Sequence, residues 1–286
     1  MRSFPHRHPG PVYAAVLAVA GLFLLASCSP DFGSSFEKQP DGSYSIPEKR
    51  FGRLAVALSG MPAEEADSLI GVLYDFADSV SCSSGDASTF RSLSEMFAGT
   101  FFTPGEPLYD EDVYAAVLRK EMQCRTVTSE EKLGIGWYLN MISCNRPGSE
   151  ITDMLLTSAD GKEIFLHDEL DGPALVFLYG SRCSLCRQLA VDLSSSESIS
   201  SACRNGRVSL ISIFVGDDDD VFGSMCRQLG PMWKNFRDAE HAVQMRNIFD
   251  LRLIPSVYAV DGDRTVLVKG AVDVSSIEDI LPQLCR

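Results

Sequence analysis

Two cysteines separated by two residues, Cys183 and Cys186, are the side chains of this sequence whose type and spacing point most directly to chemistry. Residues 174 to 178, just before them, form a continuous apolar run of strand length, and leucines follow the pair at helical spacing. We therefore expect the two thiols at the point where a buried strand passes into the first turn of a helix.

A thiol at the N-terminus of a helix lies at the positive end of the helix dipole, which favours the thiolate over the thiol. The thiolate is the form that attacks a disulfide. Arg182 adds positive charge beside Cys183, so Cys183 is the predicted nucleophile. Cys186 lies one turn further into the helix, where it is placed to attack a mixed disulfide at Cys183 and release the product.

The composition indicates a globular protein and excludes one class of partner. The chain has 286 residues, of which 45% are hydrophobic and 22% charged, enough for two modest cores. Its formal net charge is -14, and no stretch rich in Lys and Arg offsets this charge. Because phosphate backbones are repelled by such a chain, nucleic acid is not expected as a partner.

Residues 1 to 27 have the pattern of a signal peptide. Arg2 and Arg7 precede a nearly continuous apolar run from residue 12 to 26, and small residues lead into Cys28. The pattern resembles a bacterial lipoprotein signal peptide, which implies cleavage before Cys28 and attachment of a membrane-anchoring lipid to it. An uncleaved anchor or ordinary secretion are the alternatives, but the apolar run is shorter than the roughly 20 residues of a spanning helix. In each case the body of the protein lies outside the cytoplasm.

Residues 28 to 49 are rich in Ser, Gly, Pro and Asp and show no hydrophobic period, which predicts a flexible tether. Among residues 29 to 36 only Asp31 is acidic. In some bacterial lineages, surface-exported lipoproteins often carry an acidic cluster at this place. We therefore expect a cell-envelope lipoprotein that faces the periplasm.

Nine cysteines are typical of a protein from an oxidising compartment. Six remain when the lipid site and the Cys-x-x-Cys pair are set aside: Cys82, Cys124, Cys144, Cys203, Cys226 and Cys285. Three precede residue 147 and three follow it, so either one disulfide joins the two halves or each half keeps a free thiol. The six allow 15 connectivities. A zinc site is the alternative, but only His167 and His241 follow residue 28, far apart, and we expect no metal.

Residues 50 to 146 are predicted to be helical. Apolar residues recur at helical spacing in four stretches, from Leu69 to Val80, Phe90 to Phe101, Val113 to Met122 and Leu133 to Cys144. Thr128 and Glu131 form a predicted capping box for the fourth helix. Such stripes indicate a packed core rather than a cofactor site, and this half shows no catalytic constellation.

Pro147 and Gly148 interrupt the helical pattern and mark the predicted boundary of a second domain, residues 147 to 286. Strands are predicted at 151–156, 162–166, 174–178, 208–215, 253–260 and 265–269, with helices after the cysteines and at 221–229, 239–249 and 275–284. Asp-Gly turns predict hairpins at the first two and last two strands. The acidic run 217–220 is expected to cap the helix after it, with calcium binding as the alternative.

Residues 147 to 286 resemble the thioredoxin fold of the TlpA/ResA type, membrane-tethered thiol-disulfide oxidoreductases of the periplasm. The resemblance rests on the strand into Cys183-Ser184-Leu185-Cys186, the two Asp-Gly hairpins, and Ile254-Pro255 about 70 residues after the cysteines. It implies that Pro255 follows a cis peptide bond beside the Cys-x-x-Cys. It also implies that the backbone of Ile254 binds an incoming polypeptide, and we expect Arg182 to contribute to that binding.

Residues 50 to 146 resemble an uncharacterised helical domain that precedes thioredoxin-like domains in Bacteroidetes lipoproteins. The stretch from Leu108 to Tyr114 and the one from Leu139 to Gly148 carry this resemblance. The predicted fold class is therefore an α/β thioredoxin-like fold, with a central mixed sheet flanked by helices, preceded by a small all-α domain.

The sequence departs from the pattern of the family at the cysteines. Thioredoxins carry Trp before the first cysteine and commonly Gly-Pro between the two, where this chain has Arg182 and Ser184-Leu185. Phe177 stands where related proteins often have Asp or Asn, so help from that acid in deprotonating the second cysteine is missing.

Two functions follow from the sequence. The first is a thiol-disulfide oxidoreductase without a cofactor that exchanges disulfides with envelope proteins through Cys183 and Cys186. The second is an interaction or scaffold protein in which the same two cysteines form an inert structural disulfide. The accessibility and reducibility of Cys183 distinguish the two, because structural disulfides resist mild reductant.

Overall fold

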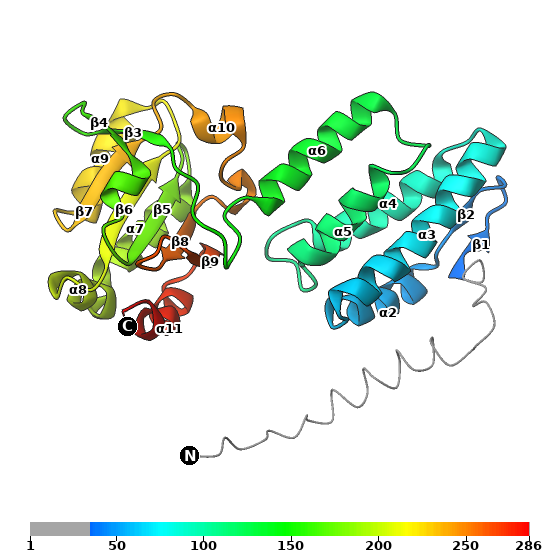
Figure 1. The fold of residues 1–286 in the computed structure, drawn as a ribbon, viewed down its shortest axis with the longest axis horizontal. Helices are drawn as coiled ribbons and strands as arrows, with labels where there is room; N and C mark the ends of the chain where they lie inside the picture. The colour runs from blue at the N-terminus through cyan, green and yellow to red at the C-terminus, as the bar shows by residue number, and fades with distance from the viewer. Residues whose placement is uncertain (1–34, 286) are drawn as a thin grey trace, which may run out of the picture. The chain divides into compact units, whose positions relative to one another are not determined.

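The computed structural model describes residues 35 to 285 (Figure 1). The described chain forms two compact units, and the division between them falls between Leu139 and Asn140. The predicted signal peptide, residues 1 to 27, and the predicted lipid site at Cys28 lie outside the described residues. Between residues 35 and 285, no helix is long and apolar enough to cross a membrane.

The first unit is built from helices around an aromatic core. Its helices are α2 (Glu48–Ser59), α3 (Ala63–Ser84), α4 (Ser88–Phe101), α5 (Glu111–Glu121) and α6 (Ser129–Ser143), the last of which continues into the second unit. Tyr74, Phe97 and Phe101 are fully buried, and the ring of Phe97 packs against the other two. Phe97 and Phe101 belong to the stripe predicted for 90–101. In α3 the prediction is partly wrong, because Ile70, Leu73 and Tyr74 are buried whereas Leu69, Phe76 and Val80 are only half-buried.

Local signals set the helix ends in this unit. Gly85 ends α3 in the left-handed conformation, with φ 74°, which glycine adopts without steric cost. The predicted capping box is confirmed, because Thr128 Oγ1 accepts from Glu131 N–H at 3.2 Å while Glu131 Oε2 accepts from Thr128 N–H at 2.8 Å. Asp110 caps α5 through the backbone N–H groups of residues 112 and 113.

The predicted tether is wrong from residue 35 onward. Strands β1 (Glu37–Lys38) and β2 (Tyr44–Ser45) form a hairpin before α2. Phe36 is buried and its ring lies 4.6 Å from that of Phe76, centroid to centroid. The backbone N–H of Tyr44 donates to Thr89 Oγ1 at 2.9 Å. The polar composition concealed an Asp-Gly turn signal, and the aromatic residues on either side of that turn hold the hairpin on α3 and α4.

The predicted apolar stripe of α6 does not pack as a core. Leu133 is 77% exposed and Trp137 44% exposed, whereas the buried residues of this helix are Met141 and Ile142, in its last turn. Periodicity shows which residues share a helix face, but whether another element covers that face is decided by tertiary packing.

The second unit contains a mixed seven-stranded sheet in the order β4-β3-β7-β6-β5-β8-β9 (Figure 1). The strands are β3 (Leu155–Ser158), β4 (Glu163–Phe165), β5 (Ala174–Tyr179), β6 (Ser209–Phe214), β7 (Trp233–Arg237), β8 (Ser256–Val260) and β9 (Val266–Ala271). β5 lies inside the sheet between β6 and β8, parallel to β6 and antiparallel to β8. All six of its residues are buried, which agrees with the continuous apolar run in the sequence.

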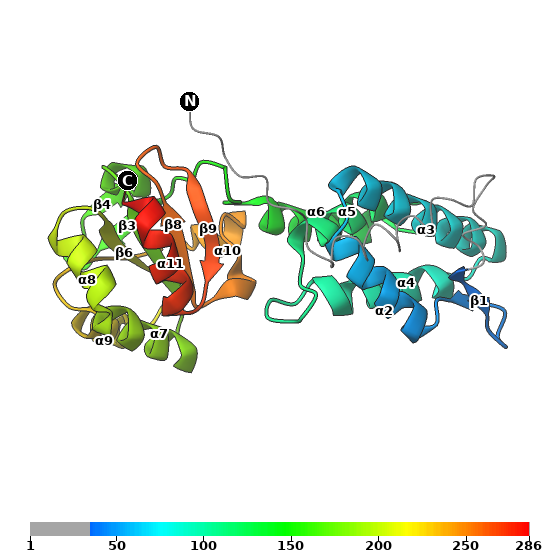
Figure 2. The ribbon, with the colours of Figure 1, turned by 90° about the horizontal axis from the view of Figure 1, so that it is seen from below.

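Helices cover the sheet on both faces. They are α7 (Ser184–Ser195), α8 (Glu197–Arg204), α9 (Asp219–Leu229), α10 (Ala242–Arg246) and α11 (Val274–Leu284), with short 3-10 helices η2 (Leu166–Glu169) and η3 (Leu251–Leu253). Alternate residues of β5 enter two hydrophobic clusters. Leu175, Phe177 and Tyr179 pack with α7, α9 and α11, and the residues between them pack with α10 and η2. Figure 2 shows α11 against β8 and β9.

Most predicted elements of this unit are present. Both hairpins pair as predicted, with β3 antiparallel to β4 and β8 antiparallel to β9. Asp218 caps α9 by accepting from Val221 N–H at 3.1 Å, so capping is confirmed as a role for the acidic run. β7 and α8 were not predicted. The strand prediction failed because β7 carries Lys234, Asn235 and Arg237 and lacks a clear alternation.

The predicted helix 239–249 is wrong in extent, because α10 covers only Ala242–Arg246. His241 and Asn247, at its two ends, are both left-handed, with φ 53° and 55°. The carboxylate of Asp238 accepts from the N–H groups of Ala242 and Val243 at 2.9 and 2.8 Å, which fixes the start of the helix. Helical propensity alone did not reveal these two interruptions.

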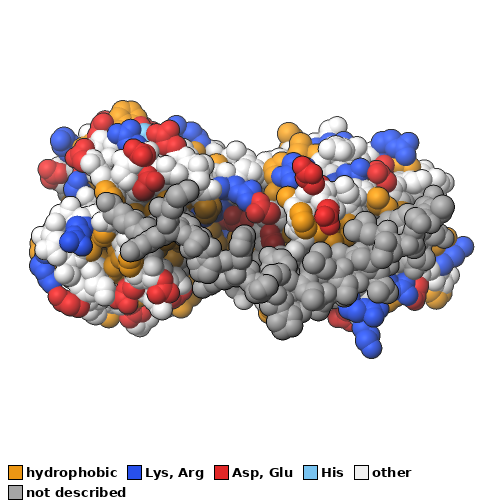
Figure 3. Space-filling model, turned by 60° about the horizontal axis from the view of Figure 1, so that its bottom comes forward, with side chains coloured by type: hydrophobic (Ala, Val, Ile, Leu, Met, Phe, Trp, Pro, Cys, Tyr) orange, Lys and Arg blue, Asp and Glu red, His pale blue; other side chains and the backbone are white. Residues whose placement is uncertain are grey.

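On the face in Figure 3, acidic and basic side chains are interspersed, and no extended basic patch is visible on the part of that face that the structure describes. No cluster of His, Cys, Asp and Glu among the described residues has the geometry of a metal site.

Candidate active site

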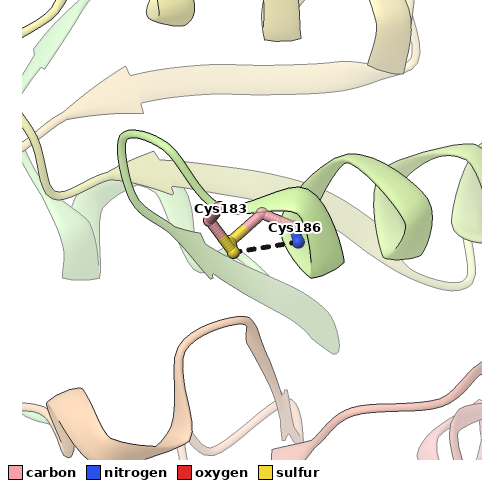
Figure 4. The surroundings of a disulfide bond; sticks show 2 residues. All are labelled: Cys183 and Cys186. Carbon is pink, nitrogen blue, oxygen red and sulfur yellow. Dashed lines mark hydrogen bonds between the residues drawn. A yellow bond between two sulfur atoms is a disulfide. The ribbon is translucent and has the colours of Figure 1, made fainter.

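The end of β5 and the start of α7 position the two cysteines. β5 ends at Tyr179, residues 180 to 183 form a loop, and α7 begins at Ser184. Cys183 is the N-cap of this helix, and its Sγ accepts a hydrogen bond from the backbone N–H of Cys186 at 3.0 Å (Figure 4). The predicted junction of strand, thiol pair and helix is therefore present, with the first sulfur at the positive end of the helix.

Cys183 and Cys186 form a disulfide, with their Cα atoms 5.2 Å apart (Figure 4). The two sides of the bond have different environments. Cys183 is partly exposed, and the two residues between the cysteines are exposed, with Leu185 at 68%. Cys186 is fully buried in the cluster with Phe177 and Tyr179. A reagent in solution therefore reaches the first sulfur more easily than the second.

The loop before β8 lies next to the loop before the cysteines. The peptide bond between Ile254 and Pro255 is cis, as the resemblance implied. A Cβ atom placed on Gly180 would lie 3.7 Å from Ile254 Cγ2, and Ile254 packs on the same hydrophobic cluster as Cys186. The antiparallel register explains this proximity, since Leu178 near the end of β5 pairs with Ser256 at the start of β8.

Arg182, the third residue predicted to contact a substrate, is exposed and left-handed, with φ 56°. Non-glycine residues rarely adopt this region, and such residues concentrate at functional sites. The structure thus brings together Arg182, Cys183, Cys186 and Ile254 with Pro255 at one end of the central strands.

Gly216 is a supporting residue that the sequence did not reveal. A Cβ atom at this position would clash with Ser181 Oγ and would lie 2.8 Å from Phe214 Cζ. The loop after β6 therefore packs directly against the loop that carries the cysteines, and only glycine fits at the contact. The only signal in the sequence was a glycine directly after a predicted strand, and such a glycine is equally typical of an ordinary strand end.

Apolar rings lie beside the second cysteine, where the sequence predicted that no acid would be found. Phe177 is fully buried and stacks on Tyr179, with ring centroids 5.3 Å apart. Burial raises the pKa of the Tyr179 hydroxyl well above its ordinary value, so this group stays neutral. Two buried acids of the described second unit are engaged elsewhere, Asp238 at α10 and Asp250 in a bidentate pair with Arg252.

The other six cysteines are unpaired in the described structure, which contains neither a disulfide between the halves nor one within a half that leaves a single free thiol. Burial raises the pKa of four of these thiols, to about 12 in the case of Cys124. The other three are Cys144, Cys203 and Cys226. A buried thiol with a raised pKa is a poor nucleophile, which sets these residues apart from Cys183.

Comparison with solved structures shows which fold this chain has. A thioredoxin-like protein from Bacteroides caccae superposes with a TM-score of 0.74 over 99% of this chain and 97% of its own, at 20% sequence identity. The fold is thioredoxin-like. No family profile matches the sequence, and no curated protein matches it.

Two further similar structures cover about half of the chain. The C-terminal domain of an uncharacterised protein from Bacteroides fragilis is 25% identical, with a TM-score of 0.46 over 48% of this chain and 98% of its own. The thioredoxin domain of a thiol-disulfide oxidoreductase from Bacteroides vulgatus is 13% identical, with a TM-score of 0.42 over 49% of this chain and 99% of its own.

Proposed function

We propose that this protein is a thiol-disulfide oxidoreductase of the TlpA/ResA type, held on a membrane by lipid at Cys28 and facing the periplasm. The observation that carries the proposal is the asymmetry of the Cys183–Cys186 disulfide at the start of α7. One sulfur is accessible and receives a backbone hydrogen bond, and the other is buried. Exchange through two thiols requires this difference, because one thiol must attack the substrate and the other must react only after a mixed disulfide has formed.

The reaction begins from the reduced protein. The Cys183 thiolate attacks one sulfur of a substrate disulfide, the substrate S–S bond breaks, and the departing substrate thiolate takes up a proton. Cys186 then loses its proton and attacks Cys183 Sγ, which releases the second substrate thiolate. Two electrons have passed to the substrate, and the protein ends in the disulfide form seen in the structure. A protein dithiol of the envelope regenerates the reduced form by the reverse exchange.

The N-terminal end of α7 supports the first step. The backbone N–H of Cys186 points at Cys183 Sγ from 3.0 Å, and a hydrogen bond to a charged acceptor is stronger than one to a neutral acceptor. The helix dipole and Arg182 favour the same charge. In this proposal the backbone of Ile254 and the exposed face of Arg182 receive the substrate chain beside the sulfur.

The scaffold function keeps one observation in its favour. The position of Phe177 places an apolar ring, fully buried, in the cluster around Cys186. Cys186 then has to lose its proton to water or to a departing substrate thiolate. If neither serves, the pair remains an inert disulfide and the protein acts only by binding.

Differential alkylation tests the proposal. The purified protein is treated with mild reductant and then with iodoacetamide for short times at neutral pH, and the modified cysteines are identified by mass spectrometry. We expect Cys183 to react first and Cys186 to remain protected, because the exposed thiolate reacts and the buried thiol does not. Cys203, which is partly buried, is an internal control. A disulfide that mild reductant leaves intact, or a Cys183 no faster than Cys203, supports the scaffold function instead.

A further inference from the structure

The first unit contains a cavity that the redox chemistry does not use. Its volume is about 320 Å³, and it is a partly open pocket lined by α4, α5, α6 and the loop between the last two. All of its lining residues belong to the first unit. The volume lies at the lower end of the range for pockets that bind small molecules.

The sequence of α6 leaves this cavity open. Gly134 lines it, and a Cβ atom at Gly134 would meet no other heavy atom within 4 Å. A larger residue at this position would extend into the space, and nothing in the backbone forbids one, because Gly134 has no positive φ. Gly134 is exposed and leaves a gap in the wall that Glu131, Ile135 and Tyr138 of the same helix form.

A buried acid lies in the otherwise largely apolar lining. Glu121 is 7% exposed, and its Oε1 accepts a hydrogen bond from Tyr74 Oη at 2.9 Å. Burial raises the pKa of the carboxyl group. No ion pair joins Glu121 to a Lys or Arg of the described chain. A buried carboxylate without a cation is costly, and a positively charged ligand would remove that cost.

The charges at Arg91 and Glu131, which also line the cavity, offset one another. A hydrogen bond from the Thr128 N–H lowers the pKa of the Glu131 carboxyl, and Arg91 lowers it further by its charge. Glu131 is exposed, as is Arg91, whereas Glu121 is buried. Among the charged groups of the lining, the buried carboxyl group of Glu121 is therefore the one without a charged partner.

Aromatic rings form much of the remaining wall. Phe90 and Tyr114 are buried, and Tyr138 is 40% exposed. Phe102 contacts the rings of Tyr114 and Tyr138 at centroid distances of 5.1 and 5.3 Å, which holds these two walls in place. The faces of such rings attract cations, and a carboxylate among aromatic rings is suited to an ammonium group.

We propose that this cavity binds an organic ammonium group carried on a short apolar stem. The ammonium would pair with Glu121, and the stem would lie along the aromatic rings and Gly134. A free alkylamine and the side chain of a lysine in a polypeptide share this chemistry. The cavity is too small for a large cofactor.

Isothermal titration calorimetry on the full mature chain tests the proposal with three probes. Pentylamine represents a free amine, Nα-acetyl-lysine methylamide represents a lysine side chain, and 1-pentanol has the same stem without a charge. We expect at least one of the two amines to bind about tenfold to a hundredfold more tightly than 1-pentanol, since an ion-paired hydrogen bond in a buried site supplies that difference. If neither amine binds better than 1-pentanol, the proposal is wrong.

Two variants locate the binding. Gly134→Phe fills the cavity and should abolish binding of the amine, whereas Gly136→Phe, on the same helix and outside the lining, should not. Glu121→Gln keeps the shape and should remove the preference for the amine over 1-pentanol. Circular dichroism confirms that each variant is folded. Binding that survives in folded Gly134→Phe at the wild-type affinity contradicts the proposed location.

Discussion

Two pairs of residues in this protein show how position changes the chemistry of one side-chain type. Cys183 and Cys186 are three residues apart, yet one is at the surface and the other is fully buried, because α7 begins between them. In the first unit, Asp110 caps a helix at the surface while Glu121 ends the same helix in the interior. The residue types were evident from the sequence, but the burial of Glu121 was not.

The raised pKa of Glu121 leads to a prediction about stability and pH. Its pKa in the folded protein lies above the ordinary value of 4.5, because burial disfavours the charged form. As pH rises above about 4.5, the unfolded chain ionises this group before the folded chain does, so the native protein loses stability that it has at lower pH. Glu121→Gln carries no such group. Its free energy of unfolding relative to wild type should therefore increase with pH.

Urea denaturation at about pH 4 and about pH 8 measures this difference. Glu95→Gln, on the exposed face of α4, is the matched control, and its difference from wild type should change little with pH. A Glu121→Gln variant whose stability relative to wild type is the same at both pH values would show that Glu121 is as well solvated as Glu95.

At the scale of elements, the sequence predicted most of what positions the candidate site. The apolar run into Cys183, the Asp-Gly hairpins and Ile254-Pro255 are local signals, and the structure has β5, the hairpins and the cis bond at these places. The proximity of Gly180 to Ile254 and the contact at Gly216 depend on which strands pair, and pairing between distant segments is not written in any one segment.

The sequence analysis did not predict two elements that are held in place by contacts with residues distant in the sequence. The hairpin before α2 is held by Phe76 and Thr89, and β7 is held between β3 and β6. β7 lacks a clear local pattern, and the Asp-Gly turn of the first hairpin was concealed by the polar residues around it. For α6 the sequence analysis made the opposite error. It predicted a packed apolar stripe, but no element of the first unit covers Leu133 and Trp137 in the described structure.

The last turn of α6 belongs to the second unit and is hydrogen-bonded within it, which has a consequence for fragments. Lys269 Nζ, almost fully buried, donates to Ile142 O at 2.8 Å, and Cys144 Sγ donates to Asn247 O at 3.3 Å. Asn145 donates to Ile248 O and accepts from Thr152 N–H at 2.8 and 2.7 Å. Ile142, Cys144 and Asn145, which make these bonds, all precede residue 147, the predicted domain boundary.

A fragment of residues 140–286 should therefore be more stable than one of residues 147–286. The shorter fragment lacks the Ile142 carbonyl that accepts from the buried Lys269 amine and the Asn145 side chain that accepts from the half-buried Thr152 N–H, and each lost hydrogen bond costs about 0.5–1.5 kcal/mol. Urea denaturation followed by circular dichroism compares the two. Equal stability would place the boundary where the sequence predicted it, and an unfolded longer fragment would show that the two units do not fold separately.

At the scale of the whole molecule, the proposed lipid at Cys28 determines where the chemistry takes place. Cys28→Ala should release the protein from the membrane fraction or leave an unprocessed precursor, because the lipid is the proposed anchor. Immunoblots of membrane and soluble fractions measure this. A Cys28→Ser variant, whose side chain is closer in size to cysteine than alanine is, tests the same point in parallel. Mature-sized protein that stays with the membrane in both variants would rule out the lipid anchor.

The central claim is that Cys183 and Cys186 act in sequence on a substrate disulfide. Trapping tests it most directly, because without Cys186 the mixed disulfide at Cys183 cannot be resolved. Envelope extracts from cells that carry Cys186→Ser should show protein-sized adducts that disappear with reductant. The double variant Cys183→Ser with Cys186→Ser retains the other six cysteines of the described chain and should show none of those adducts. The same adducts in both variants, or no adducts in either, would contradict the claim.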